Sequence, residues 1–323
     1  MKTVFVINPR AGMGKGTDSL IKKINKLSGL DTEIYITKFP GDATLFVKSY
    51  CENFGPARFI ACGGDGTFNE VLNGAIGFEN AQIGLIPVGT GNDFWRNFAK
   101  GGDFNDVLSN ISSKCVKCDA IKYTTVTDNK TITGYCANMF NIGFDCNVAD
   151  LKSKMEKKPF VFGSMSYLIS IFVMLIRKKG ADLKIETDGK EKYSGKLLLT
   201  SVANGCYCGG GIKSNPLASV TDGYININII KDVSRLKFLT LLPYYMKGTH
   251  IKLKNIEKVI LCEKCSKIKV SPGGGNMRLC VDGEIIDAGE TEFEICHNAF
   301  NFILPENHIA FDTPERTETL NCK

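Results

Sequence analysis

Three glycines surround one aspartate in the stretch Gly63-Gly64-Asp65-Gly66-Thr67. An apolar run, residues 57–62, precedes this stretch, and residues 67–76 follow it with apolar side chains at helical spacing. The glycines therefore lie at a strand-to-helix turn, where the backbone can adopt positive φ and a ligand can approach closely. Free amides at a helix start favour phosphate, whereas a carboxylate beside that phosphate requires an intervening cation. A nucleotide with Mg²⁺ is the simplest ligand for this loop.

Two more glycine-containing loops follow predicted strands in the first 120 residues. They are residues 8–12, which read Asn8-Pro9-Arg10-Ala11-Gly12, and residues 89–93, which read Gly89-Thr90-Gly91-Asn92-Asp93. In a parallel sheet the carboxyl ends of the strands meet at one edge, and ligands bind beyond that edge. The three loops therefore predict one shared phosphate-facing site. Helix capping is the alternative role for Asn92 and Asp93.

Acidic residues occur at two predicted turns in the second half of the chain, Asp222-Gly223 and Asp282-Gly283-Glu284. Asp-Gly is a strong hairpin signal, so each turn can be explained without any chemistry. Phosphoryl transfer, however, requires one carboxylate near the attacking oxygen and little else besides positioning and charge neutralisation. An acidic pair that faces a glycine loop across a cleft would supply that carboxylate.

The spacing of apolar residues predicts two domains that could position these groups. Residues 1–121 alternate strand and helix, as in an α/β domain with a parallel sheet, and residues 306–323 could complete that domain. Within it, Asp42 is predicted to cap a helix over 42–54. Residues 122–305 show period-two stretches typical of an antiparallel β-rich domain, with helices expected near 160–177 and 235–247. The predicted active site is the cleft between the domains.

Composition narrows the class of protein. The N-terminal apolar run is too short for a signal peptide, so the 13 cysteines are expected to be reduced thiols, and the two widely separated CxxC pairs do not have zinc-ribbon spacing. The net charge of +6 comes without an aromatic–basic stripe, so no nucleic acid partner is expected.

Residues 159–176 are mostly apolar and flanked by lysines, which predicts a core helix or a surface that touches anionic lipid.

Some familiar nucleotide motifs are absent. Residues 12–17 read Gly-Met-Gly-Lys-Gly-Thr, but a P-loop needs Ser or Thr directly after the lysine. The His-Arg-Asp and Asp-Phe-Gly motifs of protein kinases are missing as well. Residues 12–17 also lack the glycine at position 17 that the dinucleotide-binding pattern needs, so a phosphate-facing role for this loop would follow neither the P-loop rule nor the dinucleotide rule.

The full set of motifs resembles the diacylglycerol kinase catalytic-domain family, in particular its bacterial soluble lipid kinases, over about residues 3–305. Besides the three loops, the resemblance includes Asn69-Glu70 and Phe94 in the first domain and several stretches in the second. These stretches are residues 141–145 (Asn-Ile-Gly-Phe-Asp), 204–205 (Asn-Gly), 209–211 (three glycines), 222–223 and 281–284. Each motif is weak alone, but their presence together in this order is specific.

The resemblance implies ATP- and Mg²⁺-dependent phosphorylation of a lipid hydroxyl in the interdomain cleft. It implies three sets of residues. ATP would contact Asn8, Thr37, Gly63, Gly64, Asp65, Gly66, Thr67, Asn69, Gly89, Thr90, Asn92 and Asp93. A structural magnesium site would use Asp222 with main-chain oxygens of Ser219 and Tyr224. Catalysis would involve Asp65, Asp282 and Glu284. The base that accepts the proton of the lipid hydroxyl would be either Asp282 or Glu284. These motifs are intact, so an active enzyme is expected.

The expected acceptor is diacylglycerol, with phosphatidylglycerol, ceramide or another lipid alcohol as alternatives. A kinase of a soluble acceptor such as NAD shares the Gly-Gly-Asp-Gly-Thr loop and is the second hypothesis. A catalytically silent nucleotide- or lipid-binding protein is the third. A lipid kinase without a signal peptide is expected in the cytoplasm, in transient contact with the inner face of the membrane. A sheet edge in the second domain leaves a homodimer open.

Overall fold

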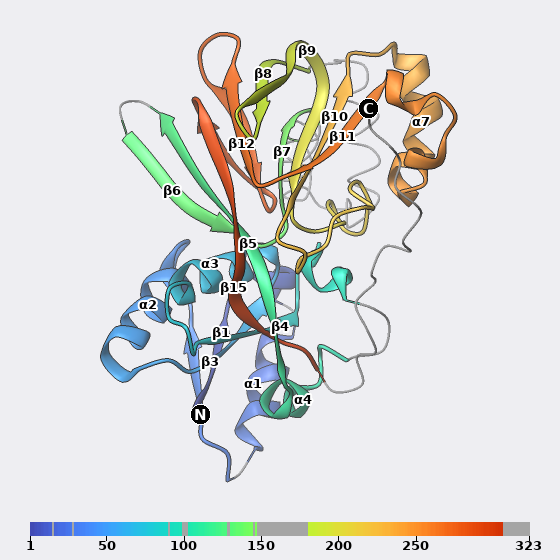
Figure 1. Cartoon of the computed structure of the whole chain (residues 1–323). Coiled ribbons are helices and arrows are strands. Elements are labelled where there is room, and N and C mark those ends of the chain that lie inside the picture. Colours follow the sequence, from blue (N-terminus) through green and yellow to red (C-terminus); the bar gives the residue numbers. More distant parts are fainter. Residues whose placement is uncertain are drawn as a thin grey trace.

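The N-terminal domain is a parallel sheet flanked by helices, shown in blue to cyan in Figure 1. The computed structural model describes residues 1–14, 16–27, 29–89, 91–98, 103–127, 130–144, 146 and 180–305. The strands lie in the order β4-β3-β1-β2, and the neighbouring pairs are all parallel. The elements of this domain are β1 (Thr3–Ile7), α1 (Thr17–Asn25), β2 (Thr32–Ile36), α2 (Asp42–Phe54), β3 (Arg58–Gly63), α3 (Asp65–Ala75), β4 (Gln82–Pro87) and α4 (Val107–Ser112), with short 3-10 helices at Ala11–Gly14 and Phe94–Asn97.

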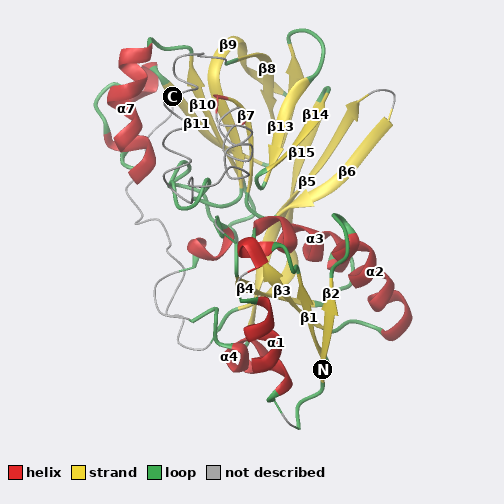
Figure 2. Cartoon of the chain, turned by 180° about the vertical axis from the view of Figure 1, so that it is seen from behind, coloured by secondary structure: helices red, strands yellow, loops and turns green. Residues whose placement is uncertain are grey.

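The described part of the C-terminal domain is built mainly from antiparallel strands, with an α-helix at its edge (Figures 1 and 2). Its strands are β5 (Cys115–Thr127), β6 (Lys130–Cys136), β7 (Met139–Gly143), β8 (Ala181–Thr187), β9 (Lys190–Ala203), β10 (Ile225–Lys231), β11 (Ile260–Cys265), β12 (Lys267–Pro272), β13 (Met277–Val281), β14 (Glu284–Ala288) and β15 (Thr291–Ile303). Helix α7 (Arg235–Lys247) confirms the helix expected near 235–247. Short 3-10 helices follow at His250–Lys252 and Ile256–Lys258. The predicted fold class is confirmed.

Two long strands connect the domains. β15 pairs with β12 and β5 in the C-terminal domain, and its end at Asn301 and Phe302 pairs in parallel with β4 of the N-terminal domain. β5 runs without a break through the boundary expected between residues 121 and 122. The segments expected to form a helix near 160–177 and a C-terminal tail at 306–323 lie outside the described residues.

An aromatic cluster fixes α3 against the turn that carries the third glycine loop. Phe68 on α3 stacks on Phe94 with ring centroids 4.7 Å apart, and Phe302 from β15 meets Phe94 edge-on at 5.0 Å. All three side chains are buried. Because buried aromatic pairs resist displacement, this cluster holds the second and third loops in one arrangement.

The start of α2 differs from its prediction. Gly41, not Asp42, is the N-cap residue, and it caps without a side chain. The first amides of the helix are instead satisfied by Glu70 of α3, whose carboxylate accepts from Gly41 N at 2.8 Å and Ala43 N at 3.1 Å. Asp42 turns the other way and accepts hydrogen bonds from Lys38 N and from the Tyr35 hydroxyl.

In the part of the chain that the structure describes, no helix is long and apolar enough to cross a membrane.

Candidate active site

A cleft of about 770 Å³ lies between the two domains. Its N-terminal wall contains the first and third glycine loops, the start of α3 and residues 37–40 after β2. Its C-terminal wall contains the residues after β6, the loop at 208–210 and the β13–β14 turn. The structure thus brings together residues from all three N-terminal loops and from the acidic turn at 282–284, as the sequence predicted. Asp65, Thr67, Asp93, Asp282 and Glu284 all line this cleft.

The Gly63–Thr67 turn is possible only with glycines. A Cβ on Gly63 would lie 2.3 Å from Thr67 Oγ1, and a Cβ on Gly89 would lie 2.5 Å from the Gly64 Cα. The Thr67 hydroxyl accepts a hydrogen bond of 3.1 Å from Asn8 Nδ2, which ties the first loop to the second. The first-turn amides of α3 have no partner within the helix and form an anion-binding end beside the cleft.

Asp65 is held at the base of the cleft by the third loop. Its Oδ1 accepts hydrogen bonds from Asp93 N at 2.7 Å and from Phe94 N at 3.4 Å. Burial raises the pKa of Asp65 to about 7, and the nearby carboxylates of Asp93 and Asp282 add to the rise. The neighbouring carboxylates thus oppose the ionisation of Asp65, and a positive charge close to it would favour the ionised form.

Asp93 links the two domains. Its carboxylate accepts from Gly210 N at 2.9 Å and from Gly211 N at 2.7 Å, both on the C-terminal wall. Its side chain makes no capping hydrogen bond to the 3-10 helix that follows it, so the capping alternative is wrong for this residue. Asp93 therefore joins the third loop of one domain to the three-glycine segment of the other.

The two carboxylates of the β13–β14 turn have different environments. Asp282 has φ +44° and accepts from Met139 N at 3.0 Å and from Asn69 Nδ2 at 3.3 Å. Burial raises the pKa of Asp282 to about 6, although these bonds and one from the Cys136 thiol oppose the rise. Asp282 is thus fixed by its surroundings on both oxygens.

Glu284, by contrast, is exposed to the cleft. Its Oε1 lies 3.0 Å from the position of a Cβ on Gly66, so the carboxylate stands over the first turn of α3. Desolvation and then the charge of Glu70 raise the pKa of Glu284. Within the described residues its carboxylate accepts no hydrogen bond, which leaves it available to a ligand.

The remaining predicted nucleotide contacts lie in different places. Thr37 lines the cleft, and its amide donates to Ile7 O at 2.9 Å, which sets it beside the first loop. Asn69 and Asn92 do not line the cleft: Asn69 bonds Tyr135 O and Asp282, and Asn92 donates to Gly89 O. Thr90 lies outside the described residues. The nucleotide roles of these residues stay predictions.

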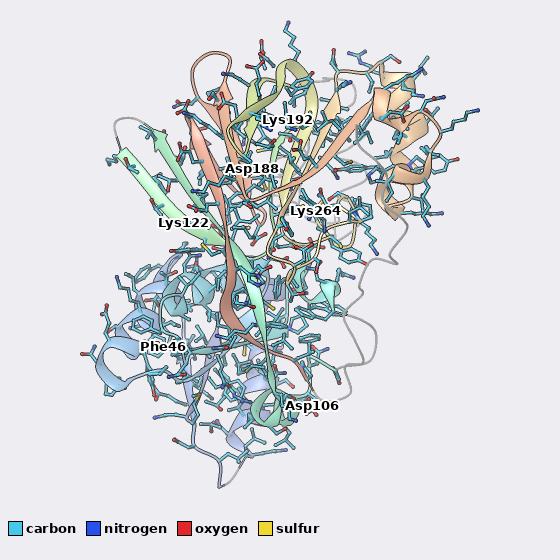
Figure 3. All side chains as sticks on the ribbon, viewed as in Figure 1. Phe46, Asp106, Lys122, Asp188, Lys192 and Lys264 are labelled. Carbon is cyan, nitrogen blue, oxygen red and sulfur yellow. The ribbon has the colours of Figure 1, made fainter. Side chains whose placement is uncertain are left out.

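The loop predicted to hold a structural metal lies away from the cleft. None of Ser219, Asp222 and Tyr224 lines it. Asp222 accepts from Tyr224 N at 3.1 Å and pairs with Lys264 Nζ at 2.5 Å, so a cation there would compete with the lysine that Figure 3 labels on β11. Within the described residues, no group of three or more His, Cys, Asp or Glu side chains is arranged to hold a metal. A metal site there stays a prediction.

Two structural carboxylates were not assigned from the sequence. Glu70 belongs to the Asn69-Glu70 motif, but its role as anchor of residues 41–43 depends on packing between α2 and α3. Asp119 is fully buried on β5 and accepts from Gly223 N at 2.7 Å and Asn298 N at 2.8 Å. His297 Nδ1 is also 2.8 Å from Asp119. No local pattern marks Asp119, since its partners are about a hundred residues or more away in the sequence.

Comparison with known proteins assigns the family. Residues 2–123 match the diacylglycerol kinase catalytic domain, and residues 138–304 match the YegS C-terminal NAD kinase beta sandwich-like domain. A diacylglycerol kinase of Staphylococcus aureus (strain MRSA252) is 31% identical over 285 residues, covering 87% of this chain and 85% of the relative. A diacylglycerol kinase of Bacillus subtilis (strain 168) is 28% identical over 308 residues, covering 94% and 96%.

A solved structure has the same fold. It is a diacylglycerol kinase from Bacillus anthracis (strain Sterne), with a TM-score of 0.66, 21% identity and coverage of 95% of this chain and 98% of that one. The matches to the two family models together cover most of the chain, and they meet at the cleft where the glycine loops face the acidic turn. The chain belongs to the diacylglycerol kinase family and is a kinase.

Proposed function

We propose that this kinase transfers the γ-phosphoryl group of ATP to the hydroxyl of diacylglycerol or a closely related lipid alcohol, with Mg²⁺. The observation that carries the proposal is the position of Glu284 over the first turn of α3, on the far side of a cleft from two glycine loops. A carboxylate facing a phosphate-binding helix start is what in-line transfer to an alcohol requires. The names of the relatives point to diacylglycerol as the acceptor.

The N-terminal wall would bind the phosphates of ATP. Amides at the start of α3 and the hydroxyl of Thr67, which is oriented by Asn8, would hold their oxygens. Thr37 and the segment after it would flank the nucleoside. Close approach of the phosphates to the backbone is possible because positions 63, 64 and 66 carry no side chain.

The carboxylates present fit a magnesium ion that is shared with the substrate. Mg²⁺ commonly binds one or two carboxylates and completes its octahedron with water and substrate phosphates. Asp65 and Asp93 would hold it, and their mutual repulsion with Asp282 would be relieved. When bound, Mg²⁺ neutralises charge on the phosphates. This arrangement needs no cluster of three or more protein ligands, in agreement with the described residues.

Glu284 would accept the proton of the attacking hydroxyl. Of the two carboxylates at this turn, Asp282 is already bonded to Met139 N and Asn69, whereas Glu284 is exposed to the cleft. Its raised pKa, caused by desolvation and by the charge of Glu70, makes it a stronger base than an ordinary glutamate. Asp282 would then be a positioning residue that holds the turn against β7 and α3.

The test is transfer of labelled phosphate from ATP with Mg²⁺ to a panel of acceptors in mixed micelles. The panel contains diacylglycerol, phosphatidylglycerol, ceramide and sphingosine, with NAD as the soluble alternative. Labelled diacylglycerol that falls by about 10²-fold or more in Glu284→Gln and in Asp65→Asn is the expected result. Label on NAD alone, or ATP binding without transfer to any acceptor, would contradict the proposal.

A further inference from the structure

Helix α7 has two apolar faces, and only one of them is buried. Phe238, Leu241 and Tyr245 point inward, where Phe238 meets Phe144 with ring centroids 5.0 Å apart. On the opposite side, large apolar side chains remain exposed in the folded chain. They are Leu236 at 78%, Leu239 at 39% and Tyr244 at 45%.

The exposed residues form one stripe along the helix. Positions 236, 239 and 243–244 follow the i, i+3, i+7, i+8 spacing of a single helix face, and Pro243 in this series is exposed too. The exposed apolar side chains of α2 are arranged differently. Leu45 and Phe54 on α2 are 61% and 79% exposed, but they are 2.5 turns apart and so lie on opposite sides of that helix. The α7 stripe is therefore a contiguous apolar surface, which soluble proteins rarely leave uncovered without a partner.

Basic residues surround this stripe. Residues 235–258 contain six basic residues and a single acidic one, Glu257. The lysines among them are all exposed, and they lie on α7 and in the segment of two short 3-10 helices after it, His250–Lys252 and Ile256–Lys258. They are Lys237, Lys247, Lys252, Lys254 and Lys258. An apolar stripe within a cationic rim matches the interface of an anionic bilayer, where acyl chains lie below negatively charged headgroups.

The helix is connected to the cleft by one loop. Met246 O near the C-terminal end of α7 accepts from Lys213 N at 3.0 Å. The loop that ends at Lys213 includes Cys208, Gly209 and Gly210, which line the cleft. Figures 1 and 2 show α7 at the outer edge of the C-terminal domain, without a described element covering its outer side. A surface bound to α7 would thus lie close to the mouth of the cleft.

We propose that the outer face of α7, formed by Leu236, Leu239, Pro243 and Tyr244 and rimmed by lysines, docks the enzyme on an anionic lipid bilayer. The apolar side chains enter the headgroup–acyl boundary, and the lysines bind the negative surface. This proposal rests on the proposed lipid acceptor, since docking there brings the cleft to the layer that contains it.

The experiment is sedimentation of the full chain with vesicles of phosphatidylcholine, alone or with phosphatidylglycerol. The test variant is Leu236→Ser/Leu239→Ser/Tyr244→Ser, and the matched control is Leu45→Ser/Phe54→Ser on α2, with folding checked by circular dichroism. Wild type and control should bind the phosphatidylglycerol vesicles equally. The α7 variant should lose at least about tenfold in partition coefficient, since it no longer buries three apolar side chains.

Charge and catalysis are tested separately. Lys237→Ala/Lys247→Ala should lower partition onto phosphatidylglycerol vesicles by about fivefold per lysine at low salt, and added salt should reduce the difference. Phosphorylation of a short-chain diacylglycerol dispersed below its micellar concentration should be unchanged in both α7 variants, because neither touches the cleft. Phosphorylation of long-chain acceptor in vesicles should fall in parallel with binding.

Three results would overturn the proposal. They are absence of wild-type binding to anionic vesicles, equal binding by the α7 variant, and a lipid-free dimer that the variant abolishes, because the face would then belong to a second copy. If the wild type binds vesicles through α7 yet phosphorylates no lipid, docking stands and the proposed function fails. If lipid is phosphorylated but the α7 variant binds vesicles as the wild type does, the proposed function stands and docking through α7 fails.

Discussion

The carboxylate of Glu284 lies so close to Gly66 that there is no room for a methyl group on Gly66 without movement of Glu284. Glu284 Oε1 is 3.0 Å from the position of a Cβ on Gly66, a distance shorter than nearly all real Cβ contacts. Gly66 is in the first turn of α3 and has an ordinary helical backbone, so its lack of a side chain is needed for space and not for conformation. The β13–β14 turn, which carries the proposed base, therefore packs against the start of α3, which would bind phosphate, at a position where only glycine leaves enough space.

We expect Gly66→Ala to lower kcat without lowering stability. Alanine is favoured over glycine in helices by up to about 1 kcal/mol, so the unfolding free energy should stay level or rise. The methyl group, however, must push Glu284 aside, and displacement of a base by a few tenths of an ångström or more should cost about tenfold or more in kcat. Steady-state kinetics and chemical denaturation measure the two effects.

The control for this substitution is Gly274→Ala, which adds a methyl group in open space at a position without positive φ. It should change neither kcat nor stability. A Gly66→Ala enzyme with wild-type kcat would show that the position of Glu284 over α3 is not used in transfer.

Glu70→Gln should loosen the segment that borders the nucleotide end of the cleft. A glutamine has only one oxygen, so either Gly41 N or Ala43 N loses its acceptor. An unsatisfied amide of this kind costs about 1–3 kcal/mol, and hydrogen exchange at residues 41–43 should accelerate. Removing the negative charge should also lower the pKa of Glu284, because Glu70 helps to raise it.

The second effect is measured as a shift of the acidic limb of the kcat/KM profile to lower pH. Glu79→Gln, at an exposed position of the same domain that does not line the cleft, is the control and should change neither observable. A profile that stays in place while exchange accelerates would mean that the acidic limb does not report Glu284.

Much of this arrangement could be predicted from the sequence because its signals are local. Alternating strand and helix patterns indicated the parallel sheet, and glycines after β1, β3 and β4 indicated where the strands end. The role of Asp93 could not be predicted, since an aspartate before a helix also fits a cap, and its partners at Gly210 and Gly211 are more than a hundred residues away.

Long-range pairing explains the other differences. β15 stays antiparallel to β5 on both sides of an irregularity between Cys296 and Phe300, while the neighbour on its other edge changes from antiparallel β12 to parallel β4. A period-two pattern predicts such a strand but not its neighbours. Capping of α2 by Glu70 rather than by Asp42 likewise depends on how two helices pack.

Stability without ligand should fall as the pH rises through the range 4 to 7. The pKa values of Asp65 and Asp282 are raised in the folded state to about 7 and about 6, so the folded chain binds more protons than the unfolded chain in this range. Each unit by which the pKa of such a carboxyl group is higher in the folded than in the unfolded chain lowers the unfolding free energy by roughly 1.4 kcal/mol, once the pH exceeds both pKa values. Urea denaturation at several pH values measures the slope.

Asp65→Asn should flatten this slope, since it removes one of the raised carboxyl groups while its side-chain oxygen can still accept from Asp93 N. Asp287→Asn, an exposed residue on β14, is the control. If Asp65→Asn and wild type keep the same slope, neither the burial of Asp65 nor its repulsion by the other cleft carboxylates opposes folding. The case for a cation between Asp65 and Asp93 would lose its electrostatic basis.

Asp93→Asn should weaken the connection between the domains. The carboxylate accepts from two amides of the C-terminal wall, and loss of its charge should cost about 1–2 kcal/mol because charged acceptors bind amides more strongly than neutral ones. Hydrogen exchange at residues 208–212 should accelerate and reports the movement of that wall. The value of kcat should fall both because the wall moves relative to α3 and because a proposed Mg²⁺ ligand loses its charge.

Asp106→Asn is the matched control, because Asp106 also accepts from a backbone amide, that of Leu108, but entirely within the N-terminal domain at α4 (Figure 3). It should leave exchange at 208–212 and kcat unchanged. If Asp93→Asn behaved in the same way, the bonds from Gly210 N and Gly211 N to Asp93 would not be needed to hold the walls together. The cleft would then keep its width through β5, β15 and the other bonds between its walls, such as that from Asn69 to Asp282.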